Sequence, residues 1–147
     1  MLDKKYNAEE KEKKWLDYWK DNKVYEFKRN GKEVYSIDTP PPTVNGKIHI
    51  GHIFSYTQTE MLARYKRLRG YDVYFQTGTD EHGEKIQQKA LNNNQTPKEF
   101  VDDVACEIKR IWDIMNTSYD RFVRTTDELH EKQVKKIFNK MYEQGDI

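Results

Sequence analysis

The stretch Pro40-Pro41-Pro42-Thr43-Val44-Asn45-Gly46-Lys47-Ile48-His49-Ile50-Gly51-His52 lies between a β-prone run at 34–39 and a helical pattern at 53–69. A helix N-terminus presents unpaired backbone N–H groups and a partial positive charge, so it favours anions. Gly51 allows a ligand to approach the backbone closely, and the imidazoles of His49 and His52 add hydrogen-bond donors at the same place. The stretch therefore predicts a phosphate-binding site at a strand-to-helix turn.

The segments on either side of this turn predict an α/β fold. Residues 34–39 and 72–76 are β-prone, and between them apolar and small residues recur at helical spacing as far as Gly70, which is typical of a helix end. A strand, a helix and a second strand over 34–76 have the length of a crossover between parallel strands. We therefore predict a Rossmann-like parallel sheet with flanking helices.

A second polar loop, at 77–83, follows the second predicted strand and reads Thr-Gly-Thr-Asp-Glu-His-Gly. In open α/β sheets, ligands bind beyond the carboxyl ends of the strands. We therefore expect the loops 40–52 and 77–83 to lie at one edge of the sheet. Asp80 is a candidate to hold the ammonium group of a ligand, and its alternative role is to cap the loop.

The remaining elements follow from local patterns. We predict helices at 8–22, 85–91, 97–115 and 127–144, a weakly indicated strand at 119–125, and a hairpin that joins 24–27 to 34–37 through an Asn-Gly turn.

Several side chains can be assigned to the core or to the surface in advance. The first helix carries an apolar stripe of Trp15, Leu16 and Trp19 that is expected to pack on the body. The core is expected to include Tyr56, Trp112 and Tyr119, and the last helix is expected to point Val134, Ile137, Phe138 and Met141 inward. The cations Arg64, Lys66, Arg67 and Arg69 are expected to be solvated at a helix end.

Composition limits the class of protein. The chain has 147 residues, which fits one domain or a piece of a larger one, and its net charge of +1 argues against a tail that binds polyanions. The single Cys106 cannot form an internal disulfide. The sequence has no apolar run near the about 20 residues of a membrane span and no signal-peptide core, so we predict a cytoplasmic protein without membrane contact. Asp80 and His82 are the nearest approach to a metal-ligand set, and no metal site is expected.

At these residues the sequence resembles a known family. The stretch 40–52, with its prolines, its Asn-Gly and the helix that follows, resembles the "HIGH" signature region of class I aminoacyl-tRNA synthetases, subclass Ia. Residues 8–70 resemble the valyl enzyme, and residues 65–147 resemble the methionyl enzyme through 77–83 and Arg124-Thr125-Thr126-Asp127. Such a mosaic indicates an ancestral-type, engineered or chimeric sequence of the branch that handles valine, isoleucine, leucine and methionine.

The resemblance implies a reaction and a set of roles. The enzyme would activate methionine or valine with ATP and Mg²⁺ as an aminoacyl-adenylate and then transfer the aminoacyl group to tRNA. Thr43 stands where the family often has tyrosine or asparagine, which leaves the choice of amino acid open. The implied catalytic residues are His49 and His52, the ATP site adds Gly46 and Gly51, and the amino-acid site comprises Pro41, Pro42, Thr43, Asp80 and His82.

The resemblance also implies an organisation. The family's Lys-Met-Ser-Lys loop, its second Rossmann half, its zinc-bearing insertion and its anticodon-binding domain have no counterpart in the sequence, so no zinc site is expected. We predict a single N-terminal catalytic half-domain over 1–147, truncated before the connective insertion, with a helical and hairpin extension at 1–33 and a Rossmann-like half at 34–147. The alternatives are a non-catalytic ATP-binding half-domain and a nucleotidylyltransferase of the same superfamily.

Overall fold

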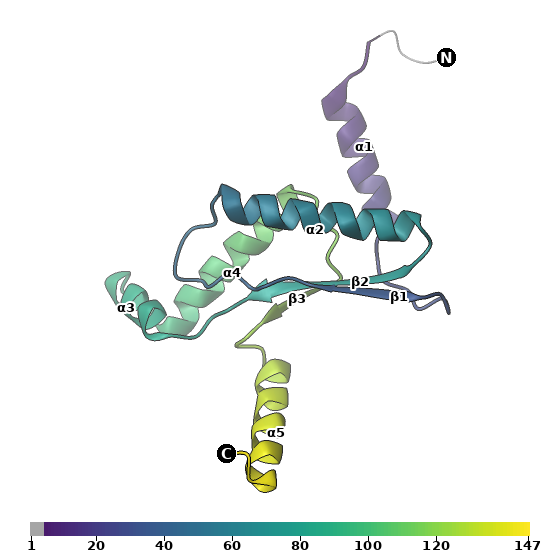
Figure 1. Ribbon diagram of the computed structural model, residues 1–147. Helices are drawn as coiled ribbons and strands as arrows, with labels where there is room; N and C mark the ends of the chain where they lie inside the picture. The colour runs from purple at the N-terminus through teal and green to yellow at the C-terminus, as the bar shows by residue number, and fades with distance from the viewer. Residues whose placement is uncertain (1–4) are drawn as a thin grey trace.

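A computed structural model describes residues 5–147 of the chain and contains three strands and five helices within them (Figure 1). In chain order the elements are α1 (Ala8–Asp21), β1 (Val34–Asp38), α2 (Ile50–Leu68), β2 (Asp72–Thr79), α3 (Glu84–Asn92), α4 (Pro97–Ile114), β3 (Arg121–Arg124) and α5 (Glu128–Gln144).

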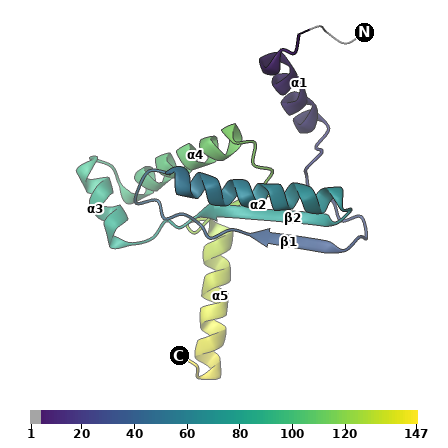
Figure 2. The same cartoon turned by 45° about the horizontal axis from the view of Figure 1, so that its top comes forward.

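The three strands form one parallel sheet in the order β1-β2-β3. β1 pairs with β2 from Val34 opposite Asp72 onward, and β2 pairs with β3 from Gln76 opposite Arg121 onward. α2 and α4 lie on one side of this sheet, α3 lies beyond the carboxyl ends of the strands, and α5 leaves from the other side (Figures 1 and 2). The predicted α/β fold with a parallel sheet is confirmed, including its weakly indicated third strand.

The core consists of two apolar clusters under α2. One lies between α2, α3 and α4 and is centred on Trp112, whose ring stacks on that of Tyr56 at 4.1 Å. The other lies between α2 and the sheet and contains Phe75 of β2. The predicted core positions of Tyr56 and Trp112 are confirmed, and Tyr119 is partly buried against both clusters.

Gly78 marks a very close approach of β2 to β3. A Cβ atom at this position would lie 1.9 Å from the carbonyl oxygen of Val123 and 2.8 Å from its carbonyl carbon. Because both atoms belong to the backbone of the neighbouring strand, a side chain fits only if the two strands move apart.

We expect Gly78→Ala to destabilise the protein. Overpacking a core usually costs about 1–3 kcal/mol, and the loss here is expected to be at least as large. Urea unfolding followed by circular dichroism measures this loss. Gly46→Ala is the matched control, because a Cβ there meets no atom within 4 Å. Equal unfolding midpoints for the two variants would contradict the close approach.

The predicted hairpin is wrong, because residues 24–32 form a turn, bends and irregular backbone but no strand. Two aspartates from distant segments accept backbone N–H groups from the predicted strand and from the predicted turn. Asp120 Oδ1 accepts from Phe27 N at 2.6 Å, and Asp72 Oδ2 accepts from Asn30 N at 2.7 Å. These carboxylates hold the segment against the sheet without a strand partner, which a local sequence pattern does not reveal.

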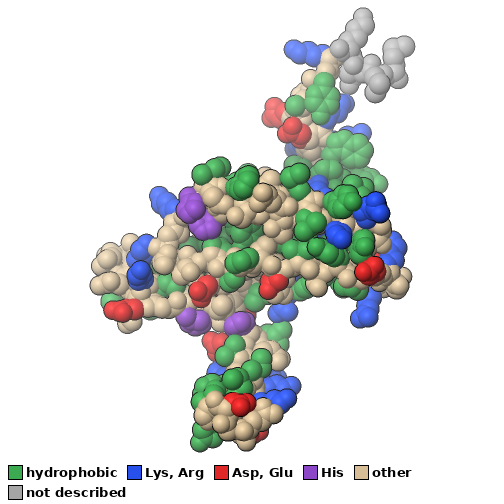
Figure 3. Space-filling view, viewed as in Figure 1, with side chains coloured by type: hydrophobic (Ala, Val, Ile, Leu, Met, Phe, Trp, Pro, Cys, Tyr) green, Lys and Arg blue, Asp and Glu red, His purple; other side chains and the backbone are tan. Residues whose placement is uncertain are grey.

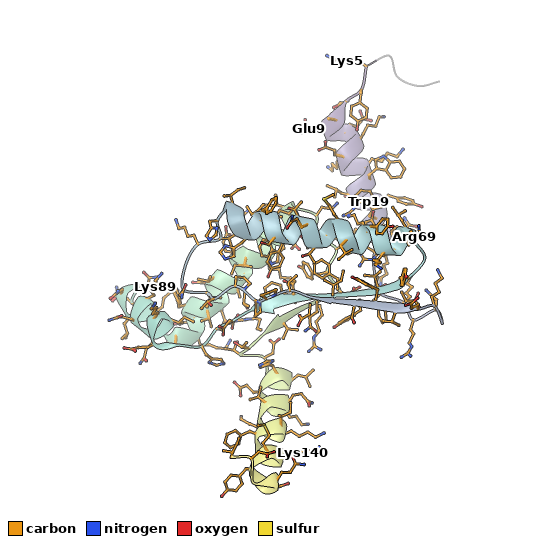
Figure 4. All side chains as sticks on the ribbon, in the orientation of Figure 1. Lys5, Glu9, Trp19, Arg69, Lys89 and Lys140 are labelled. Carbon is orange, nitrogen blue, oxygen red and sulfur yellow. The ribbon has the colours of Figure 1, made fainter. Side chains whose placement is uncertain are left out.

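The prediction that the basic cluster at the end of α2 is solvated is wrong for two of its members. Arg64 donates to Glu60, to the hydroxyl of Tyr25 at 2.9 Å and to the carbonyl of Asn116 at 2.9 Å. Its guanidinium also lies 5.1 Å from the ring centre of Trp19, which Figure 4 labels near the C-terminal end of α1. The distant partners of Arg64 hold the N-terminal segment on α2.

Arg67, the second of these two members of the cluster, is partly buried. It donates to the carbonyl of Ser118 at 3.1 Å and lies 3.7 Å from a carboxylate oxygen of Asp120. Burial lowers the pKa of Arg67 and raises the pKa of Asp120. Arg67 therefore fixes the turn that leads into β3.

The two terminal helices do not pack as expected. α5 has no buried residue, and Val134, Ile137, Phe138 and Met141 are all exposed, so their predicted inward orientation is wrong. α1 likewise has no buried residue, and Trp15 and Leu16 are exposed. Figure 3 shows apolar side chains on the surfaces of both helices. Helical periodicity predicts that an apolar face exists, but it does not predict which element covers that face.

Candidate active site

The two polar loops meet at the carboxyl edge of the sheet. Thr43 pairs with Asp80 in a parallel bridge beyond the ends of β1 and β2. Asp80 N donates to the carbonyl of Pro42 at 3.0 Å, and Val44 N donates to the carbonyl of Asp80 at 3.0 Å. The expectation that 40–52 and 77–83 share one edge is confirmed, because parallel strands carry the loops that follow them to the same side.

Two histidines begin α2. His49 is the N-cap residue, and its Nδ1 accepts from Gly51 N at 3.1 Å, while Nδ1 of His52 accepts from His49 N at 3.4 Å. The two side chains form a reciprocal pair in the manner of a capping box, with ring centres 4.0 Å apart. The helix consequently begins at Ile50, three residues before the predicted start.

This capping arrangement fixes the hydrogen-bonding roles of both imidazoles. A nitrogen that accepts a hydrogen bond carries no proton, so Nδ1 is unprotonated and a neutral ring carries its proton on Nε2. His49 is exposed and His52 is partly exposed. Both rings can therefore offer an Nε2–H donor at the positive end of α2, where the helix dipole also favours an anion.

A cavity of about 270 Å³ adjoins the start of α2. The hydroxyl of Tyr56 donates to the carbonyl of Pro40 at 3.0 Å and fixes the loop on one side of it. The cavity is lined by Thr39, Pro40, Gly51, His52, Ser55, Tyr56 and Thr59. Its walls are mostly apolar, and His52 and the hydroxyl-bearing side chains supply its few polar atoms.

Gly51 has a local role that its place in the signature does not reveal. A Cβ atom at this position would lie 2.9 Å from Cε1 and 3.0 Å from Nδ1 of His49. Residue 51 must therefore lack a side chain for the His49 ring to fold back and cap the helix. Gly51 was predicted to leave space for a ligand next to the backbone. In this structure the His49 ring occupies that space.

Gly46 lies apart from the cavity that His52 lines. It borders a larger cavity of about 790 Å³ on the other side of the loop 44–48, with apolar walls from α4. Lys89 of α3, which Figure 4 labels, donates to the carbonyl of Asn45 at the mouth of this cavity. Of the four predicted ATP-site residues, the structure brings together His49, Gly51 and His52.

The predicted amino-acid residues lie on the two bridged loops. Pro42 is buried, whereas Pro41 and Thr43 are exposed and Asp80 is partly exposed. His82 is exposed, and its Nε2 lies 3.3 Å from the carbonyl oxygen of Thr125. The bridge between Thr43 and Asp80 therefore places the loop 41–43, predicted to belong to the amino-acid site, next to Asp80, which is predicted to hold the ammonium group.

Glu81 is a buried residue of this loop that the sequence reasoning missed. Its side chain is fully buried and accepts from Arg124 Nε at 2.7 Å and from a second Arg124 nitrogen at 2.9 Å. These hydrogen bonds raise the pKa of Arg124 above its ordinary value. The available signal was topological, because Arg124 lies near the carboxyl end of the strand predicted at 119–125 and therefore reaches the same sheet edge.

Residues 5–147 contain no group of three or more His, Cys, Asp or Glu residues that could hold a metal ion. No helix within that range is long and apolar enough to cross a membrane.

Comparisons with known proteins identify relatives. The family model described as "tRNA synthetases class I (M)" matches residues 35–147. A methionine–tRNA ligase from Enterococcus faecalis is 47% identical over 116 residues, and one from Caldanaerobacter subterraneus is 52% identical over 116 residues. Each match covers 79% of this chain but only 17% and 18% of the respective relative. The chain thus spans less than a fifth of the length of these relatives.

Two solved structures are also similar to this chain. The Mycobacterium tuberculosis methionyl-tRNA synthetase in complex with methionyl-adenylate is 36% identical, with a TM-score of 0.74, over 77% of this chain and 22% of that one. The Agrobacterium radiobacter LeuRS in a ternary complex with tRNA and LeuAMS is 22% identical, with a TM-score of 0.85, over 96% of this chain and 18% of that one, which shows a shared fold.

The family match bears on the predicted mosaic. It begins at residue 35 and therefore includes the second half of the segment that resembles the valyl enzyme. The resemblance of residues 8–70 to the valyl enzyme stays a prediction. The family model covers most of the chain, including both loops of the site, and the chain belongs to the class I (M) tRNA synthetases.

Proposed function

We propose that the chain is a catalytic part of a methionyl-tRNA synthetase that binds ATP and methionine and forms methionyl-adenylate. The observation that carries this proposal is the bridge between Thr43 and Asp80, since it joins the loop that leads into α2 to the loop that bears the candidate ammonium ligand. Methionine is favoured over valine because the relatives at 47% and 52% identity are methionine–tRNA ligases.

The proposed reaction needs no protein nucleophile. The carboxylate of methionine attacks the α-phosphorus of ATP, a new P–O bond forms, and the bond to the bridging oxygen breaks so that pyrophosphate leaves. The Nε2–H groups of His49 and His52, together with the N-terminus of α2, would donate hydrogen bonds to phosphate oxygens as charge moves onto them. Mg²⁺ would accompany ATP. Catalysis would then rest on positioning and electrostatic stabilisation.

The amino-acid half of the proposed site lies on the bridged loops. The Asp80 carboxylate would hold the ammonium group of methionine through a charge-assisted contact of about 1.5–3 kcal/mol. Pro41, Pro42 and Thr43 would line the side chain of methionine, and His82 would complete this part. Both loops are joined by backbone hydrogen bonds, so the ammonium contact and the side-chain pocket would keep a fixed separation.

The remaining parts of the proposal concern the whole protein. The methionyl group would pass to tRNA in a cytoplasmic enzyme. The chain would act as one N-terminal catalytic half-domain with an extension at 1–33 and a Rossmann-like half at 34–147.

Amino-acid-dependent ATP–pyrophosphate exchange tests the proposal. The 147-residue chain is expected to exchange label with methionine and to exchange much less with valine. ATP binding without exchange for either amino acid would contradict activation and would favour the non-catalytic ATP-binding half-domain. Transfer of AMP to another acceptor without methionine would favour a nucleotidylyltransferase instead.

A further inference from the structure

The carboxylate of Glu81 is the centre of a buried polar network. Its two oxygens accept from two nitrogens of Arg124 and from the hydroxyls of Thr79 and Thr126. The Glu81 side chain has no solvent exposure, whereas that of Arg124 is 23% exposed. A buried carboxylate with a paired guanidinium and two hydroxyl donors has a fixed orientation, because each oxygen has partners that restrain it.

The network extends to the helix layer. A nitrogen of Arg124 also donates to Asp102 of α4 at 2.6 Å, and Asp102 pairs with Lys98 on its exposed side at 2.8 Å. Arg124 ends β3, so it connects that strand, α4 and the loop after β2. The Glu81–Arg124 pair therefore joins the loop 77–83 to β3 and, through Asp102, to α4.

The backbone around Asp80 is restrained from both sides. On one side, Thr125 N donates to the carbonyl of Thr79 at 3.2 Å, and Glu81 N donates to the Thr125 hydroxyl at 2.9 Å. On the other side, Asp80 forms its two backbone hydrogen bonds to the loop 42–44. In this extended segment Thr79 and Glu81 are buried, while the residues that alternate with them, Asp80 and His82, are partly or fully exposed.

We propose that the Glu81–Arg124 pair is a positioning device for the amino-acid half of the site, which holds Asp80 against the loop 42–44 so that its carboxylate faces the substrate ammonium group. This inference rests on the proposed function for the identity of the substrate. The positioning itself does not depend on substrate, because it is a statement about the backbone hydrogen bonds of Asp80. Glu81 touches no substrate in this account and acts through Asp80.

The physical basis is the charge of the pair. When Glu81 is replaced by glutamine, the shape is kept but one of the two Arg124 nitrogens loses its acceptor. Arg124 then has Asp102 as its remaining anionic partner and is drawn toward α4. The segment 125–126 loses its anchor, and the strand pairing between Asp80 and 42–44 is expected to open more often.

The experiment compares three variants of the 147-residue chain: Glu81→Gln, Arg124→Lys and Glu107→Gln. Glu107 is the matched control, because it also accepts from two nitrogens of an arginine, Arg110, but does so on the exposed face of α4. The first readout is amide hydrogen exchange at Val44 and Asp80, with the buried Ala63 of α2 as the reference amide. The second is the affinity of each variant for methionine and for ATP.

For Glu81→Gln we expect protection at Val44 and Asp80 to fall by about tenfold or more, with no change at Ala63, as for a local opening. Methionine affinity is expected to fall by about tenfold, the usual effect of losing one charged hydrogen bond, while ATP affinity stays within about twofold. Arg124→Lys keeps the charge but loses the paired geometry, so a smaller loss of the same kind is expected. Glu107→Gln is expected to match the parent.

Unchanged protection at Val44 and Asp80 in Glu81→Gln would overturn the proposal, as would equal losses at those amides and at Ala63. If Glu81→Gln does not fold, the same comparison with Arg124→Lys decides. If the parent chain binds no methionine, the proposed function fails. In that case a selective loss of protection at Val44 and Asp80 would still support the positioning role, so the two failures are distinguishable.

Discussion

Replacing His49 by asparagine is expected to lower methionine-dependent pyrophosphate exchange by about 10²–10³-fold, the usual cost of one donor to a developing anionic charge. The same substitution is expected to leave the stability of the fold near that of the parent. Asparagine is among the best N-cap residues, so it can accept from the backbone as the His49 Nδ1 does. It lacks a group at the position of Nε2, however, so only the proposed contact to phosphate is lost.

Pyrophosphate exchange and urea unfolding, measured on the same preparation, separate these two roles. Thr96→Asn is the matched control, because it changes the capping residue of α4 to asparagine at a helix start that does not belong to the site. We expect it to keep both stability and exchange. If His49→Asn loses stability but keeps exchange per folded molecule, then His49 serves only to cap α2.

The position of the site was predictable from the sequence because it depends on topology. A strand, a helix and a strand of the observed lengths impose a parallel pair, and a parallel pair brings the two following loops to one edge. The bridge between Thr43 and Asp80 is a direct consequence of that order. The start of α2 was harder to predict, because histidine is not a usual capping residue and the reciprocal bonds of His49 and His52 appear only in three dimensions.

What the sequence could not predict depends on partners far apart in the chain. Glu81 and Arg124 are 43 residues apart, and Asp120 and Phe27 are 93 apart, so no local pattern relates them. Each of these carboxylates accepts from groups that lie far from it in the chain. The second case turned a predicted hairpin into an irregular segment. The apolar face of α5 shows the same limit, because periodicity identifies a face without identifying what covers it.

Replacing Trp112 by alanine is expected to destabilise the protein by about 3–5 kcal/mol, the usual loss for a buried tryptophan. The Trp112 side chain is 0% exposed and stacks on Tyr56, so its removal leaves a cavity between α2 and α4. Domains of this size are generally stable by about 5–15 kcal/mol, so the loss would be a large part of the total. Urea unfolding measures it, and Trp15→Ala, at a tryptophan that is 48% exposed, is the matched control.

A second variant, Trp112→Phe, tests which property of the side chain matters. Within the described part of the chain the indole Nε1 of Trp112 is buried without a hydrogen-bond partner, so stability at this site comes from packing and stacking. Phenylalanine keeps an aromatic face toward Tyr56 and removes the unpaired donor, and it is expected to lose much less stability than alanine.

Because the Tyr56 hydroxyl holds the carbonyl of Pro40, the alanine variant should also loosen the loop that leads to His49. Exchange activity per folded molecule should then fall in Trp112→Ala and stay near the parent in Trp112→Phe. Equal losses of stability in the two variants would contradict the role of the aromatic stack and would show that the full volume of the indole is needed.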